Sequence, residues 1–375
     1  MEILVEEYRK RTATIKTAMA DEELDLLLVY ARGSRNMYSN VLYLTGYYCF
    51  DPCEEAIFFL PFEGEPELVL NVDWDLRRAA LTSWVSEIRS ARHLASAIIE
   101  YCNQPRFSSA RIGIVGHTYI PSSLYLEVKE GLSRRSLVTA THLVERLRLT
   151  KSEKEIELLR EAARLTGLGI EAATKALREG VTEIEIVAEA YSAMLGNGAD
   201  EIAFTPQVSF GENTYVCMAP AGQKSLQRSK MVMFDMGCLY HHYVGDLSRT
   251  RFLGRPTGEQ RRIYEITLEA QEAAIEVVRP GITAGEVDHM ARSIIEEAGY
   301  GQYFDHWLGR GVGLDLHERP WIDVSDETIL EPGMVFSIEP GIYLPGVGGT
   351  RIEDTILVTE EGYEVLSDVD KSLVI

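Results

Sequence analysis

Three stretches between Met231 and Glu353 constrain this chain most, because each places acidic side chains inside an apolar, strand-like run. The acids are Asp235, Asp246, Glu339 and Glu353. A carboxylate in such a run costs free energy unless a partner compensates its charge. Four acids at strand ends, with His306 and His317 nearby in the sequence, indicate a site that collects cations.

Each acid also has a purely structural interpretation. Asp235 and Asp246 could cap backbone N–H groups of a loop between two strands, and Glu339 could be an exposed loop residue. Glu353 follows Arg351 by two positions, so both would point to one face of a strand and could form a simple salt bridge. We favour a shared site because the runs around these acids resemble those of a known family.

The same residues carry a family resemblance. With Glu339-Pro-Gly-Ile-Tyr and Arg351-Ile-Glu-Asp, the aspartate pair resembles the pita-bread family of aminopeptidase P, prolidase, methionine aminopeptidase and creatinase (peptidase family M24). Metal-dependent members hold two divalent ions with two Asp, one His and two Glu. The resemblance implies that Asp235, Asp246, Glu339 and Glu353 are the four carboxylate ligands.

The resemblance also implies catalytic and substrate-binding residues. Glu339 would be the catalytic base, and His317 and His306 would be catalytic residues that contact the substrate. Arg351, beside Glu353, is a further candidate for substrate binding. His241 and His242 lie between the two aspartates and could replace a missing ligand, although an exposed hairpin tip is the simpler prediction.

Two positions depart from the family pattern. Arg310 stands where the family has its metal-binding histidine, and an arginine has no lone pair for a metal. Met218 stands where peptidases and creatinase have a histidine that handles a proton, and a thioether cannot do so.

Arg310 leaves two outcomes open for the cofactor. Four close carboxylates cannot all stay ionised without cations. One outcome is a single divalent ion held by carboxylates, of the Mn, Mg or Co type. The other is no metal, with Arg310 bridging acids through its planar fork and one remaining acid taking up a proton.

The rest of the chain predicts two domains. Residues 1–148 alternate helix and strand and predict an α/β domain like the N-terminal domain of creatinase and prolidase. Residues 149–375 predict an α+β pita-bread catalytic domain with a pseudo-twofold, because Gly180-Val-Thr-x-x-Glu recurs as Gly281-Ile-Thr-x-x-Glu. Four S/T-x-x-E/Q capping boxes mark helix starts at Ser152, Thr182, Thr257 and Thr283. The resemblance implies a homodimer.

Charge and cysteine usage limit the partners. The net charge of -21 argues against nucleic acid and anionic membranes. The five cysteines form no CxxC pair, and the N-terminus lacks the pattern of a signal peptide, so we expect a cytoplasmic protein without a membrane span. The expected partner is a small molecule or short peptide as substrate.

Three functions remain open at this point. The first is a C–N bond hydrolase resembling Xaa-Pro aminopeptidase or prolidase, with a defective or altered dinuclear metal site. The second is a creatinase-like hydrolase of a small amidino or cyclic amide compound that needs no metal. The third is a non-catalytic binding protein on the same fold.

Overall fold

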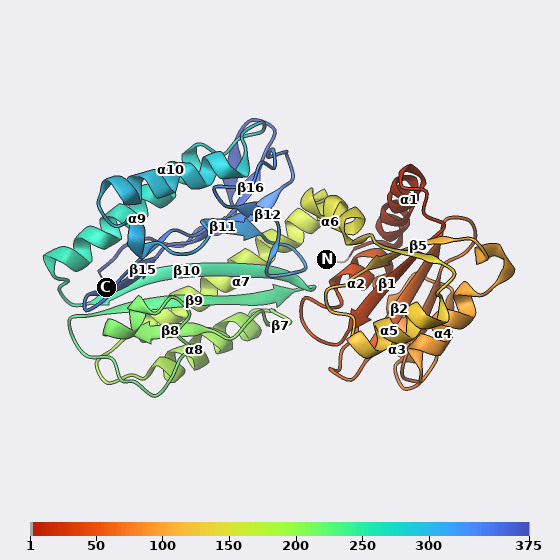
Figure 1. Cartoon of the computed structure of the whole chain (residues 1–375). Coiled ribbons are helices and arrows are strands. Elements are labelled where there is room, and N and C mark those ends of the chain that lie inside the picture. Colours follow the sequence, from red (N-terminus) through yellow and green to blue (C-terminus); the bar gives the residue numbers. More distant parts are fainter. Residues whose placement is uncertain (1–2, 375) are drawn as a thin grey trace. The chain divides into compact units, whose positions relative to one another are not determined.

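The structure is a computed structural model that describes residues 3–374 (Figure 1). The chain forms two compact units, which divide between Arg148 and Leu149. Each unit has its own sheets and its own apolar core. Among the described residues, every helix is too short or too polar to span a bilayer.

The N-terminal unit is built on one mixed sheet with the strand order β4-β3-β2-β1-β5-β6. The strands are β1 (Leu26–Arg32), β2 (Glu55–Pro61), β3 (Glu67–Leu70), β4 (Glu87–Ser90), β5 (Arg111–Val115) and β6 (Ser136–Thr139). The helices are α1 (Val5–Asp21), α2 (Ser39–Thr45), α3 (Leu76–Thr82), α4 (Leu94–Cys102), α5 (Ser122–Gly131) and α6 (Thr141–Leu149), with a 3-10 turn at Pro105–Phe107. Strand β1 lies in the middle and is buried along six of its seven residues, as its continuous apolar run predicts.

The C-terminal unit contains two successive sets of helices and strands. The first set is α7 (Glu153–Ala176), α8 (Glu183–Gly196), β7 (Glu201–Ile202), β8 (Gln207–Phe210), β9 (Lys230–Tyr240) and β10 (Tyr243–Leu253). The second set is α9 (Gly258–Glu276), α10 (Ala284–Glu297), β11 (Gly309–Gly311), β12 (Glu318–Ile322), β13 (Val335–Ile338), β14 (Gly341–Leu344), β15 (Gly348–Arg351), β16 (Asp354–Val358) and β17 (Tyr363–Val365). Short 3-10 turns lie at Gly211–Tyr215 and Gly301–Tyr303.

Each set packs its helix pair against its own strands. Figure 1 shows α9 and α10 along one side of the strands and α7 and α8 along the other. One core joins apolar residues of α7 and α8 to β8, β9 and β10, and a second joins α9 and α10 to β13 and β16. This order of two helices followed by strands occurs twice, which is the pita-bread arrangement expected from the sequence repeat.

The sequence predicts the helix starts of this unit correctly. Ser152, Thr182, Thr257 and Thr283 each accept a hydrogen bond from the backbone N–H three residues later, and the Glu or Gln there accepts one from the cap residue's N–H. These reciprocal bonds satisfy donors that a helix cannot pair internally.

The cap of α10 gives a first testable prediction. Thr283→Ala should lower the free energy of unfolding by about 1 kcal/mol, because the N–H of Glu286 loses its acceptor. Ser293→Ala is the matched control in the same helix, since its hydroxyl donates to the carbonyl of His289 one turn away. Chemical denaturation of both variants checks the prediction, and equal effects would contradict it.

Candidate active site

The hairpin of β9 and β10 positions the two aspartates. Asp235 pairs with Ser248, and Asp246 pairs with Gly237, in an antiparallel register. Asp235 and Gly237 share a strand face, and directly opposed residues share a face too, so both carboxylates point to the same side. The sequence placed the acids at strand ends, but Asp235 and Asp246 lie within long strands.

The two glutamates come from the second set of strands. Glu339 directly follows β13, and its N–H donates to the carbonyl of Leu308 at 2.7 Å. Glu353 lies between β15 and β16, and its N–H donates to the carbonyl of Ser248 at 3.1 Å. That bond ties Glu353 to the strand that carries Asp246, so the two halves of the unit meet at the acids.

Arg310 lies among these acids on the short strand β11. Its guanidinium donates to the carboxylate of Asp246, its Nε lies 3.7 Å from Glu339 Oε1, and its Nη1 lies 3.6 Å from Glu353 Oε1. The residue is only 6% exposed. The structure therefore brings Arg310 into ionic contact with three of the four acids.

The backbone around Arg310 permits this close approach because glycines flank it. A Cβ at Gly309 would lie 1.9 Å from the carbonyl oxygen of Ser337, and one at Gly311 would lie 2.2 Å from that of Arg319. Any side chain at either position would push β11 away from its neighbours. The glycines thus allow β11 to lie between β12 and β13 with the guanidinium against the acids.

The residues of this site do not fit the family's two-metal centre. Oxygens of Asp235, Asp246 and Glu353 lie within 4.8 Å of one another, a spacing that one cation could bridge. The guanidinium already contacts Asp246 and Glu353, however, and it offers no ligand atom. A metal ion here would have to displace a buried ion pair.

A second buried guanidinium, that of Arg351, pairs with the fourth acid, Asp235. Arg351 donates to the carboxylate of Asp235, and through Nη1 to the Tyr343 hydroxyl at 3.0 Å and to the carbonyl of Cys217 at 3.0 Å. Burial nevertheless raises the pKa of Asp235 to about 7, since the charge of Arg351 offsets the loss of solvent only in part.

The pKa values of the two glutamates shift in opposite directions. Burial, together with the charges of Asp246 and Glu339, raises the pKa of Glu353 well above its usual range. Burial would also raise the pKa of Glu339, but the charges of Arg310 and Arg351 outweigh it and lower that pKa. Carboxyl groups with separated pKa values are typical of acid–base sites.

A cavity of about 390 Å³ opens beside the acids. Its lining is Phe204, Thr205, Gln207, Cys217, Met218, Asp235, His306, Trp307, Gly309, Arg310, Leu316, His317, Glu339 and Arg351. Asp246 and Glu353 do not belong to this lining and are each about 1% exposed. The volume is within the range of ligand pockets, roughly 300–1,000 Å³.

The two histidines differ in what their ring nitrogens contact. His306 Nδ1 lies 2.7 Å from the carbonyl of Trp307, so Nδ1 carries the proton, and Nε2 then accepts from the Tyr343 hydroxyl at 3.0 Å. His317 is exposed at the cavity and makes no hydrogen bond within residues 3–374. Burial lowers the pKa of His306. The surrounding cavity walls bury the His317 ring in part although it stays open to solvent, and this partial burial and then the charge of Arg310 lower its pKa. His317 is therefore the neutral imidazole that is free to meet a ligand.

The remaining sequence candidates lie as follows. Met218 is 69% exposed at the cavity, where Gln207 contacts its sulfur. His241 and His242 form the two-residue turn between β9 and β10, and both have positive φ. That turn places them at the hairpin tip, as the sequence predicts.

Sequence reasoning missed three side chains that orient the acids. Ser337 donates to Glu339 Oε1 at 2.9 Å and accepts from the N–H of Arg310, and Ser248 donates to Glu353 Oε2 at 2.9 Å. Tyr343 joins His306 to Arg351. The Ser337–Glu339 spacing of two on a strand was the available signal, since such residues share a face.

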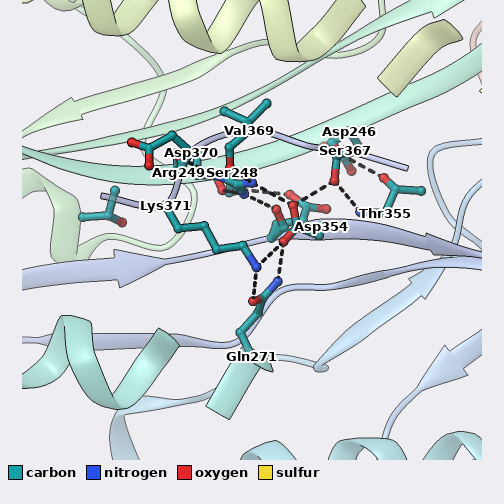
Figure 2. Close-up of polar contacts among 12 residues, drawn as sticks. Asp246, Ser248, Arg249, Gln271, Asp354, Thr355, Ser367, Val369, Asp370 and Lys371 are labelled. Carbon is teal, nitrogen blue, oxygen red and sulfur yellow. Dashed lines mark hydrogen bonds and ion pairs between the residues drawn. The ribbon is translucent and has the colours of Figure 1, made fainter. Parts of the chain in front are cut away.

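A buried polar network supports the strands that carry the acids (Figure 2). Asp354 accepts from Arg249 at 2.7 Å, Gln271 at 2.7 Å, Lys371 at 2.8 Å and Ser367 at 2.8 Å. Arg249 and Asp354 are fully buried. Arg249 directly follows Ser248 in the sequence and Asp354 directly follows Glu353, and Ser248 donates to Glu353 in the site. The network therefore fixes β10 and β16 relative to each other.

Comparison with known proteins gives the same family as the geometry. Residues 157–360 match metallopeptidase family M24, and residues 11–150 match the creatinase/prolidase N-terminal domain. The chain belongs to family M24.

Several relatives match along most of their length. The Xaa-Pro dipeptidase of Pyrococcus horikoshii is 41% identical over 255 residues, which are 68% of this chain and 73% of the relative. The putative dipeptidase YkvY of Bacillus subtilis is 36% identical over 338 residues, 90% of this chain and 93% of the relative. The crystal structure of the prolidase from P. horikoshii OT3 aligns with a TM-score of 0.87 at 33% identity, covering 97% of this chain and 99% of that one.

Proposed function

We propose that this chain is a C–N bond hydrolase that acts on a dipeptide-sized amide bound in the cavity. The observation that carries the proposal is the position of Glu339, whose carboxylate lines that cavity in a chain of family M24. Because the relatives named as Xaa-Pro dipeptidases match most of this chain, Xaa-Pro dipeptides are the first substrates to consider.

Glu339 is the proposed general base. Its lowered pKa keeps the carboxylate ionised at neutral pH, so it can take a proton from a water molecule in the cavity. The water oxygen bonds to the carbonyl carbon, and Glu339 then passes the proton to the leaving nitrogen as the C–N bond breaks. The products are a carboxylic acid and an amine. Ser337 holds the carboxylate in place during both transfers.

His317 is the proposed donor to the carbonyl oxygen of the substrate. Its neutral ring can donate one N–H to the charge that develops on that oxygen. His306 is also proposed to act on the substrate carbonyl. Both of its ring nitrogens already have hydrogen-bond partners, so its effect passes through Tyr343 to Arg351. Arg351 would then orient the substrate from the cavity wall.

A second candidate is a hydrolase of small amidino or cyclic amide compounds. The specific observation in its favour is the guanidinium of Arg310 in contact with Asp246, Glu339 and Glu353, the acids that the resemblance assigns to metal binding. With Met218 at the rim, the site departs from the peptidases at two positions, so the substrate can differ from theirs.

A substrate panel tests these functions. We expect the purified chain to hydrolyse Xaa-Pro dipeptides, with Pro-Xaa dipeptides as the control of reversed order. Turnover of cyclic amides or amidino compounds alone would select the second candidate. Stoichiometric binding without turnover of any compound would contradict hydrolysis and favour a binding protein.

We also propose that the chain works as a homodimer in the cytoplasm. The family resemblance supports a dimer, and free cysteines at positions 49, 53, 102, 217 and 238 suit a reducing compartment. Light scattering coupled to size-exclusion chromatography should give twice the mass of 42.1 kDa. A monomer mass at micromolar concentration would contradict the dimer.

A further inference from the structure

We propose that the guanidinium of Arg310 permanently fills the cation position of the acidic cluster, so that the site works without a divalent metal. The inference concerns the site of the proposed function, but it does not rest on any particular substrate. It can be tested by metal binding alone.

The contacts around Arg310 support this role. One guanidinium reaches Asp246, Glu339 and Glu353, which come from three separate segments of the unit. A planar fork with fixed charge can bridge several carboxylates in this way, whereas a lysine would present one compact charge. Arg310 therefore links three of the acids that the resemblance assigns to metal binding.

The position of Arg310 is also fixed by its own backbone. Its N–H donates to the Ser337 hydroxyl at 3.2 Å, and the same hydroxyl donates to Glu339. Glycines on both sides keep β11 tightly between two strands. Withdrawing the guanidinium would leave Asp246 without its ion-pair partner and Glu339 with only the charge of Arg351, and an unpaired buried charge is strongly unfavourable.

The cavity lining shows what an entering ion would meet. The guanidinium of Arg310 lines the cavity, whereas Asp246 and Glu353, the two most buried of the four site acids, do not. A divalent ion would approach a fixed positive charge before it reached them, and like charges at this range repel strongly in a buried site.

The unpaired polar atoms of the cluster agree with this arrangement. Within residues 3–374, Asp246 Oδ1 and Glu353 Oε1 are buried acceptors that receive no hydrogen bond. Arg310 Nη1 is a buried donor that makes none, because its distance of 3.6 Å from Glu353 Oε1 is an ion contact only. A metal ion would suit the two oxygens and repel the nitrogen. A small neutral molecule that both donates and accepts, such as water, suits all three.

Calorimetric titration with Mn²⁺ tests the proposal on the full-length chain. We expect no stoichiometric binding to the parent. Arg310→His removes the charge and adds a nitrogen ligand, so it should bind Mn²⁺ at least about a hundredfold more tightly. Arg310→Met removes only the charge and should fall between the two. Arg228→His, at an exposed surface pair with Glu179, is the control and should behave as the parent.

The outcomes separate clearly. Stoichiometric binding of one or two Mn²⁺ ions by the parent would overturn the proposal, as would an Arg310→His variant that folds and binds no better than the parent. If that variant does not fold, the parent titration decides alone. Absence of turnover with every substrate of the panel would count against the proposed function, but it would not change the conclusion drawn from Mn²⁺ binding.

Discussion

Glu339→Gln should lower the turnover number of the hydrolase by about a hundredfold to ten-thousandfold, the usual contribution of a general base. The amide keeps the shape of the side chain and can still contact Ser337, but it cannot take a proton from water. Because the base acts in the transition state, turnover and kcat/KM should fall together.

Steady-state kinetics on the best substrate of the panel measure this effect. Glu331→Gln is the matched control, because Glu331 is exposed and lies outside the cavity lining. Near-parental turnover in Glu339→Gln would show that another group accepts the proton, and Asp235 would be the next residue to test because it lines the same cavity.

Asp354→Asn should lower the free energy of unfolding by about 3–5 kcal/mol, because loss of the carboxylate leaves the fully buried Arg249 without its counter-charge. The amide would also turn a donor toward Arg249, Lys371, Gln271 or Ser367, all of which donate to this side chain now (Figure 2). Urea unfolding of the C-terminal unit measures the loss.

The control for this substitution is Asp370→Asn. The Asp370 side chain is 70% exposed and lies 3.8 Å from Arg251, so its loss should cost less than about 1 kcal/mol. A similar small cost for Asp354→Asn would contradict the structural role of the network.

The effect of Asp354→Asn should also depend on pH. Burial alone would raise the pKa of Asp354, but Arg249 and Lys371 outweigh it and lower that pKa. A lowered pKa contributes stability that is present above the unfolded value, about 3.9 for aspartate, and is lost as the pH falls through the folded value. The gap between parent and variant should therefore narrow in acid. A gap that widens there would contradict the lowered pKa.

The helix starts of the C-terminal unit and the central strand of the N-terminal unit could be predicted from the sequence because their signals are local. The capping boxes at Ser152 and Thr283 mark helix starts by themselves, and the apolar run of β1 marks a buried strand. The four acids could be grouped from their place in apolar, strand-like runs, whereas Arg310 joined them only through the family resemblance. Asp246 and Glu353 are far apart in sequence and meet through β10 and β16.

Other features of the site depend on tertiary contacts that leave no local signal. The pairing of Arg351 with Asp235 and the occupied nitrogens of His306 follow from strands that meet only in the folded chain. The sequence spacing also does not predict that Arg310 lines the cavity while Asp246 and Glu353 are buried away from it. The sequence placed Asp235 and Asp246 at strand ends, and it did not predict the long strands within which they lie.

Hydrolysis by protein that has been dialysed against a strong chelator tests the central claim most directly. The claim is that a hydrolytic site of family M24 works here with the guanidinium of Arg310 in place of divalent metal. We predict that the rate is unchanged after chelation and is not increased by added Mn²⁺ or Co²⁺. A rate that is lost on chelation and restored by either ion would contradict the claim.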